Sequence, residues 1–281
     1  MERPRNAQEI RALKGVRRQT WITAYDYPQA AMAEASGIDV ILVGDSLGMT
    51  TLGYANTLPV TLEDMIHHAS AVRRGAPNSC IIVDMPFLTY TTPLEAVVHA
   101  GRILQHCQVE GVKLEGGRRI AAQVEALVNE AIPVVGHLGL TPQSVHRFGG
   151  YRVQARQAEA IATLIEDAER LCEAGVSAIV LEGIPDRVAS YVTDRIPVPT
   201  IGIGAGRGTD GQVLVFHDCI GLSERLPKFV SPFAQARATI VEGLTRYRDA
   251  VLTGSFPDDA HSYHLSEQEW ERFMKEFDGK A

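Results

Sequence analysis

The stretch that decides the fold holds three short apolar runs that each end in an acid: VILVGD at 40–45, CIIVD at 80–84 and GVKLE at 111–115. A helix-like segment follows each run, and the same unit recurs along the chain. The strand-like runs are residues 21–25, 40–43, 80–83, 111–114, 132–136, 178–181, 199–203 and 213–216. Strands that alternate with helices form a parallel sheet, and eight such units close into a barrel. We therefore predict an α/β protein with a (β/α)8 TIM barrel.

Two helices are expected outside these units. Residues 7–14 precede the first strand and predict an N-terminal helix that closes the barrel's N-terminal mouth. Residues 266–277 combine a capping-box motif with an apolar stripe at helical spacing, which predicts a C-terminal helical extension that docks on a surface. We expect the barrel domain to span residues 1–264, with residues 233–253 as its eighth helix, and the extension to span residues 265–281.

Charge and cysteine content narrow the class of protein. The 281 residues carry a formal net charge of −7, which argues against non-specific binding to nucleic acid. The four cysteines lie far apart without a CxxC pair, so we expect reduced, mostly buried thiols. No apolar run approaches the roughly 20 residues of a membrane span, and the N-terminus lacks the apolar core of a signal peptide. We therefore expect a cytoplasmic protein.

Three carboxylates end neighbouring strands. The carboxyl ends of barrel strands meet on one face, so Asp45, Asp84 and Glu115 should lie together there. Without a cation they would repel and raise one another's pKa, and a hard divalent ion such as Mg²⁺ would remove that repulsion. Alternatively, each acid only caps the helix that follows it. Their occurrence on successive strands favours the metal site.

Side-chain alternation brings further groups inside the barrel. Lys113 and Glu115 share one face of their strand, and the apolar residues beside Lys113 occupy the other. The apolar face suits the helix layer, so the charged pair should point inward, where an unpaired charge would be costly. By the same alternation we expect Ile41, Val43 and Asp45 to share a face.

Lys113, His137 and Glu182 each admit more than one role. Lys113 pairs with a substrate carboxylate or forms a Schiff base, and the neighbouring acids favour the first. His137 hydrogen-bonds the ligand or a carboxylate, or it is a core histidine that donates to a backbone carbonyl. Glu182 is an outer metal ligand, a partner of Lys113 or a general base, and the base is favoured if it lies across the pocket from the metal.

Glycines mark turns and helix ends. Gly75, like the glycines at 37 and 175, is predicted to end a helix as a C-cap. The run GIGAG at 202–206 fits a phosphate-binding loop or simply a tight turn after a strand. The long connections 46–59 and 139–155 leave the carboxyl face, so we expect them to be lids or substrate walls.

From about residue 20 to residue 264, the chain resembles the ketopantoate hydroxymethyltransferase family. The most specific segments are GDSLGMT at 44–50, GHLGLTPQS at 136–144, and GIGAG at 202–206 followed by TDGQ at 209–212. The resemblance implies an enzyme that transfers a hydroxymethyl group from 5,10-methylenetetrahydrofolate to 2-oxoisovalerate (3-methyl-2-oxobutanoate). The product is ketopantoate, an intermediate of pantothenate and coenzyme A biosynthesis. The family also uses one Mg²⁺ per subunit.

The resemblance assigns roles to particular positions. It implies metal ligands at Asp45, Asp84 and Glu115, oxoacid-binding residues at Asp45, Ser46, Asp84 and Lys113, and a proton acceptor at Glu182. We add His137 as a substrate-binding residue. The family further implies a homo-oligomer, a homodecamer. The net charge and the lack of a long apolar run predict no nucleic-acid or membrane partner. A rival function is another Mg²⁺-dependent oxoacid aldolase or lyase that needs no folate; a phosphate- or flavin-binding barrel is a more distant one.

Overall fold

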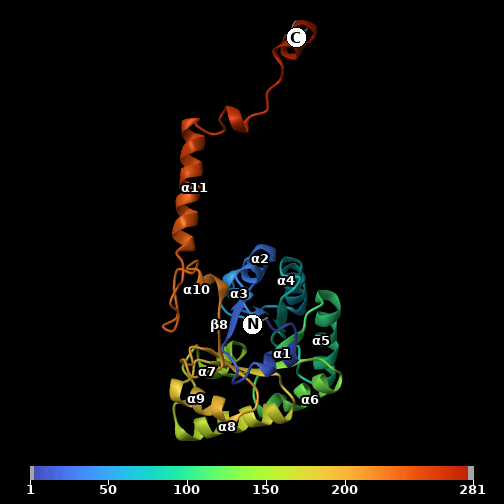
Figure 1. The fold of residues 1–281 in the computed structure, drawn as a ribbon, viewed down its shortest axis with the longest axis vertical. Coiled ribbons are helices and arrows are strands. Elements are labelled where there is room, and N and C mark those ends of the chain that lie inside the picture. Colours follow the sequence, from blue (N-terminus) through green and yellow to red (C-terminus); the bar gives the residue numbers. More distant parts are fainter. Residues whose placement is uncertain (1–2, 278–281) are drawn as a thin grey trace. The chain divides into compact units, whose positions relative to one another are not determined.

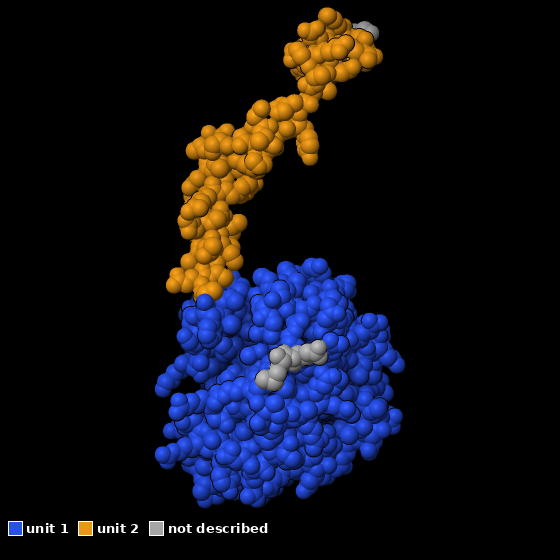
Figure 2. Space-filling model, viewed as in Figure 1, with its two compact units in different colours: residues 1–233 blue, residues 234–281 orange. Residues whose placement is uncertain are grey.

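The computed structural model describes residues 3–277 and divides into two compact units, residues 1–233 and 234–281 (Figure 2). The first unit is a closed barrel of parallel strands in sequence order, with helices on its outside (Figure 1). Its strands are β1 (Gln19–Thr23), β2 (Val40–Val43), β3 (Cys80–Asp84), β4 (Gly111–Glu115), β5 (Val134–Gly139), β6 (Ala178–Glu182), β7 (Thr200–Ile203) and β8 (Gly211–Leu214). The prediction of a (β/α)8 barrel is confirmed.

In the first unit, α1 precedes the first strand and the other helices follow the strands. They are α1 (Ala7–Ala12), α2 (Tyr27–Ala35), α3 (Leu47–Thr50), α4 (Leu62–Gly75), α5 (Pro93–Cys107), η1 (Arg118–Ile120), α6 (Ala121–Asn129), η2 (Pro142–Ser144), α7 (Val145–Phe148), α8 (Ala158–Glu173), α9 (Asp186–Arg195) and α10 (Phe216–Cys219). Complete capping boxes begin α4 at Thr61 and α5 at Thr92. Each box satisfies backbone N–H groups that a helix start would otherwise leave unpaired.

Strand ends differ from the apolar runs by up to three residues. β1 begins at Gln19 because that residue pairs with Gly211 of β8, and its amide donates to the carbonyl of Asp210 at 2.9 Å. For the same reason β8 starts at Gly211, two residues before the expected run. The hydrogen-bond ladder between neighbours, rather than the apolar run, sets where a strand starts.

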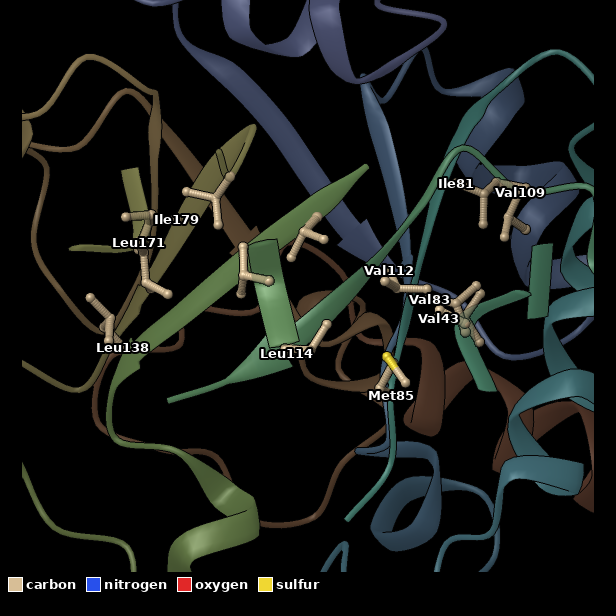
Figure 3. Close-up of a cluster of buried hydrophobic side chains, with 14 of the residues drawn as sticks. Val43, Ile81, Val83, Met85, Val109, Val112, Leu114, Leu138, Leu171 and Ile179 are labelled. Carbon is tan, nitrogen blue, oxygen red and sulfur yellow. The ribbon is translucent and has the colours of Figure 1, made fainter. Parts of the chain in front are cut away.

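Two apolar clusters separate the inside of the barrel from its outer layer. The inner cluster includes Trp21, Leu42, Ile82 and Val180, and Ile10 of α1 closes it, as predicted for the N-terminal helix. The outer cluster, between strands and helices, contains the strand residues Ile41, Val43, Val112 and Leu114 (Figure 3). Lys113 and Glu115 therefore face inward, as predicted.

The prediction that Asp45 shares a face with Ile41 and Val43 is wrong. Ile41 and Val43 belong to the outer layer, so strict alternation would turn Asp45 away from the barrel interior. The strand ends at Val43, and Asp45 lies in the turn that leads to α3, where its amide donates to Asp84 Oδ2 at 3.1 Å. The turn, and not the strand period, directs Asp45 into the site.

Gly75 also has another role than expected. It lies inside α4 without a left-handed backbone, and the following Ala76 is the C-cap. A Cβ at Gly75 would lie 2.3 Å from the carbonyl oxygen of Tyr27 in α2. The glycine therefore permits close approach of two helices. Gly37 and Gly175 do have positive φ after α2 and α8, as predicted.

The second unit contains α11 (Ala236–Thr253), η3 (Asp259–His261) and α12 (Glu267–Glu276). The Ser266 hydroxyl accepts a hydrogen bond from the Glu269 amide and begins α12, which confirms the C-terminal helix. The helix expected as the eighth of the barrel is α11, and it has no buried residue. The expected domain boundary after residue 264 falls within this unit and stays a prediction.

No helix within residues 3–277 has the length and apolar character needed to cross a membrane. The four cysteines are free thiols; Cys80 and Cys107 are buried, and Cys172 and Cys219 are half-buried.

Candidate active site

The carboxyl ends of β2 to β6 bring the predicted residues into one buried cluster. Its side chains are Asp45, Asp84, Lys113, Glu115, His137 and Glu182, which we call the carboxylate cluster. All are buried except Glu182, whose side chain keeps 17% of its accessible surface. The cluster lies where barrel enzymes have their active sites.

Lys113 stands between two acids. Its Nζ lies 3.2 Å from Asp84 Oδ1 and 4.0 Å from Glu115 Oε1. Burial opposes its charge, but Asp84, Glu115 and Asp45 raise the pKa of Lys113 above its ordinary value. A lysine held in the ammonium form is a poor nucleophile, so the geometry favours charge pairing over Schiff-base chemistry.

His137 links two carboxylates. Its Nδ1 lies 3.4 Å from Glu115 Oε1 and its Nε2 lies 3.3 Å from Glu182 Oε2. Burial and the Lys113 ammonium oppose protonation, but these two acids raise the pKa of His137 to about 9. Lys113 Nζ is also 3.1 Å from Nδ1, but a protonated ring cannot accept that hydrogen bond, so Nδ1–H then faces Glu115. The alternative of a core histidine that donates to a backbone carbonyl is not what the structure shows.

The pKa values of Asp45, Asp84 and Glu115 are shifted in different directions. Burial, together with the charges of Asp84 and Glu115, raises the pKa of Asp45 well above its ordinary value. Burial also raises the pKa of Asp84, although Lys113 opposes this. Glu115 is buried as well, yet its hydrogen bond with His137 lowers its pKa. Asp45 and Asp84 are thus the two acids that a nearby cation would stabilise most.

A divalent cation fits this donor set. Asp84 Oδ1 is buried, and among the described residues its close polar neighbour is the Lys113 ammonium at 3.2 Å, which does not form a hydrogen bond of good geometry with it. With four carboxylates ionised and both basic groups protonated, the cluster keeps two negative charges, which one divalent ion neutralises. No group of three or more His, Cys, Asp or Glu side chains within residues 3–277 is placed to enclose a metal. Mg²⁺ takes one or two protein carboxylates and completes its shell with water and substrate oxygens.

Ser46 lies beside the cluster at the start of α3. Its Oγ is 2.8 Å from the hydroxyl of the buried Tyr25 and makes no capping hydrogen bond. Burial raises the pKa of Tyr25 to about 12, so the phenol stays protonated and can donate to Ser46. Tyr25 therefore orients a hydroxyl at the edge of the site.

Gln143 is a site residue that the sequence interpretation missed. Its side-chain Nε2 donates to Asp45 Oδ2 and to the carbonyl of Met85, both at 2.9 Å. Its backbone N–H donates to Glu115 Oε2 at 3.0 Å. The Tyr90 hydroxyl donates to its Oε1. The segment GHLGLTPQS was recognised, but only its histidine was singled out. The available signal was a glutamine just after a strand carboxyl end.

The GIGAG run is explained by packing. Gly204 and Gly206 have positive φ, and a Cβ at Gly206 would lie 2.4 Å from Cβ of Asp186 in α9. A Cβ at Gly202 would lie 2.7 Å from Thr209 Oγ1. These contacts support the tight turn, because only glycine fits there.

Comparison with known proteins agrees on one family. The sequence model of the family described as ketopantoate hydroxymethyltransferase matches residues 5–259. The chain is 55% identical to the 3-methyl-2-oxobutanoate hydroxymethyltransferase of Syntrophobacter fumaroxidans over 93% of each chain. It is 49% identical to the enzyme of the same name from Oleidesulfovibrio alaskensis, over 97% of this chain and 95% of that one.

Solved structures share the fold at low identity. Phosphoenolpyruvate phosphomutase from Streptomyces platensis subsp. rosaceus superposes with a TM-score of 0.60 at 15% identity, covering 97% of this chain and 99% of that chain. A phosphonopyruvate hydrolase in complex with oxalate and Mg²⁺ gives the same TM-score and coverage at 10% identity. These likenesses support the barrel fold alone.

Proposed function

The chain belongs to the ketopantoate hydroxymethyltransferase family, a family of transferases of pantothenate biosynthesis, and on that premise we propose its reaction. The proposed reaction moves a hydroxymethyl group from 5,10-methylenetetrahydrofolate to 3-methyl-2-oxobutanoate and forms ketopantoate. The observation that carries this proposal is the carboxylate cluster, where a buried ammonium, two buried aspartates and the partly exposed Glu182 lie together.

Mg²⁺ would be held by Asp45 and Asp84, with Glu115 as the third acid associated with it. When bound, the ion supplies Lewis-acid polarisation of a carbonyl, which acidifies the adjacent C–H. The proposal of one Mg²⁺ per subunit is supported by the buried Asp84 Oδ1, which accepts no hydrogen bond of good geometry, and by a barrel neighbour solved with oxalate and Mg²⁺.

The chain's own residues bind and orient the oxoacid. The Lys113 ammonium pairs with the substrate carboxylate, since it is buried and its charge is held by the surrounding acids. The Ser46 hydroxyl, oriented by Tyr25, supplies a further hydrogen bond. His137 contributes to the same binding surface while it holds Glu115 and Glu182 in place.

Glu182 removes the proton from C3 of the oxoacid. Its carboxylate lies 3.3 Å from His137 Nε2, which separates it from Glu115, and it is the most exposed acid of the group. Water adds to the methylene group of the folate and its bonds to nitrogen break, which releases tetrahydrofolate and the one-carbon unit as formaldehyde. C3 of the enolate attacks that carbon, a carbon–carbon bond forms, and the new alkoxide takes up the proton held by Glu182. We extend the proposal to the homodecamer expected of the family and to the cytoplasmic location expected from the sequence.

Exchange of the C3 proton tests this function directly. In deuterated water with Mg²⁺ and 3-methyl-2-oxobutanoate, but without folate, the protein should exchange C3–H, and EDTA should stop the exchange. Glu182→Gln should slow it about 10²–10⁴-fold while oxoacid binding persists. Glu130→Gln, at an exposed site after α6, is the control and should behave as wild type.

Two outcomes would contradict the proposal. If the wild-type protein neither exchanges C3–H nor needs methylenetetrahydrofolate for turnover of the oxoacid, the reaction is another one. If Glu182→Gln exchanges C3–H at the wild-type rate while overall transfer collapses, Glu182 acts on the folate half.

A further inference from the structure

The loops that leave the carboxyl ends of β2 and β5 meet through one pair of side chains. Met49 lies in α3, within the connection after β2, and Tyr151 lies in the connection after β5. The Tyr151 hydroxyl donates to Met49 Sδ at 3.4 Å. Both side chains nevertheless remain exposed, Met49 by 40% and Tyr151 by 47%. We call this pair the rim pair.

The backbone holds Tyr151 in place. Gly149 and Gly150 have positive φ and turn the chain just before it. The amide of Gln154 donates to the carbonyl of Gly183 at 2.8 Å, which ties the loop to the residue that follows Glu182. Tyr151 is thus anchored to the strand end that carries the proposed base.

The Tyr151 phenol feels the charges of the carboxylate cluster. Partial burial raises its pKa, and the charges of Asp45, Glu182 and Glu115 raise it further. These acids lie at or just beyond the carboxyl ends of three different strands, so the phenol is within electrostatic range of the cluster. The contact with Met49 and the hydrogen bond from Gln154 to Gly183 place Tyr151 beside the mouth of the site.

An exposed aromatic ring beside an exposed thioether suits a ligand that presents the planar face of a heterocycle. Aromatic side chains stack on heterocycles, and methionine adapts its shape to the edge of a ring. Small-molecule sites typically combine such apolar surface with a few polar groups. Arg152 and Arg147, both exposed on the same loop, add positive charge that suits an anionic tail.

We propose that the rim pair, Tyr151 and Met49, binds the bicyclic ring of the one-carbon donor above the oxoacid. This inference rests on the proposed function, because it places the second substrate of that reaction. The ring enters through the open mouth, and its one-carbon unit meets the enolate between the rim and the carboxylate cluster. Arg152 pairs with the carboxylates of the glutamate tail.

Variants of Tyr151 distinguish an effect on folate binding from an effect on oxoacid binding. For Tyr151→Ala, the KM for methylenetetrahydrofolate should rise about tenfold or more, and tetrahydrofolate binding in calorimetry should weaken equally. Folate-independent C3–H exchange and the affinity for the oxoacid should stay at wild-type values. Tyr151→Phe keeps the ring and should retain most of the folate affinity, and Met49→Ala should give a smaller loss than Tyr151→Ala.

Tyr191→Ala serves as the matched control, since Tyr191 is an exposed tyrosine on α9 outside the mouth. An unchanged folate KM in Tyr151→Ala would overturn the inference. A loss of C3–H exchange in that variant would also overturn it, because Tyr151 would then act on the oxoacid. A changed oligomeric state with unaltered folate binding would overturn it as well, because Tyr151 would then belong to a subunit contact. Absence of exchange in the wild-type protein would instead refute the proposed function.

Discussion

Replacing Gln143 by leucine should separate cation binding from simple stability. The substitution keeps the backbone amide that donates to Glu115 but removes the amide group that joins Asp45, Met85 and Tyr90. Asp45 Oδ2 then loses a charge-assisted hydrogen bond, worth about 1.5–3 kcal/mol, and two neutral hydrogen bonds worth about 0.5–1.5 kcal/mol each are lost. The free energy of unfolding should fall by about 2.5–6 kcal/mol.

The second effect concerns the metal. Removing a partner that orients a ligating carboxylate typically costs about 10–100-fold in metal affinity. We expect the Kd for Mn²⁺, used as a spectroscopic substitute for Mg²⁺, to rise by that factor in a paramagnetic-resonance titration. Urea unfolding in EDTA measures the stability change without the cation.

Gln123 provides the matched control. It is as buried as Gln143, but its Nε2 donates only to the carbonyls of Tyr90 and Thr91. Gln123→Leu should therefore lose about 1–3 kcal/mol of stability and leave the Mn²⁺ affinity unchanged. If Gln143→Leu binds Mn²⁺ as tightly as wild type, or if both variants weaken it equally, the reasoning about Asp45 is refuted.

Three further predictions follow from individual side chains. Asp84→Ala should remove most Mg²⁺-dependent turnover while the barrel stays folded by circular dichroism; near-normal turnover would dismiss Asp84 as a ligand. Borohydride added with the oxoacid should leave no adduct on Lys113 by mass spectrometry, and a reduced adduct there would restore the Schiff-base role. Burial alone would raise the pKa of Asp39, but hydrogen bonds from Arg17 and Thr20 lower it. The ionised Asp39 therefore stabilises the fold above the ordinary carboxyl range, and this contribution is lost as pH falls through the lowered pKa. Asp39→Asn should cost about 1–3 kcal/mol near neutral pH and progressively less in acid, and a constant difference in urea unfolding across that range would contradict the linkage.

Local pattern was sufficient for the architecture and for most of the carboxylate cluster. Strand and helix alternate along the chain, and this repetition alone predicts a parallel barrel whose strand ends converge. The period of two within a strand placed Lys113 and Glu115 inside correctly, because both belong to β4. Residues carried by a regular strand can be placed from sequence, since the geometry of the strand is the same in every protein.

Positions outside regular elements were decided only by the tertiary structure. Asp45 enters the site through a turn, so the strand period misplaced it. Gln143 reaches Asp45 across 98 positions of sequence, and no local pattern indicates which loop side chain will meet which acid. Gly75 is required by the carbonyl of Tyr27 on another helix rather than by its own helix end. In each case the deciding contact joins two distant segments, and its geometry exists only once the barrel has closed and brought them together.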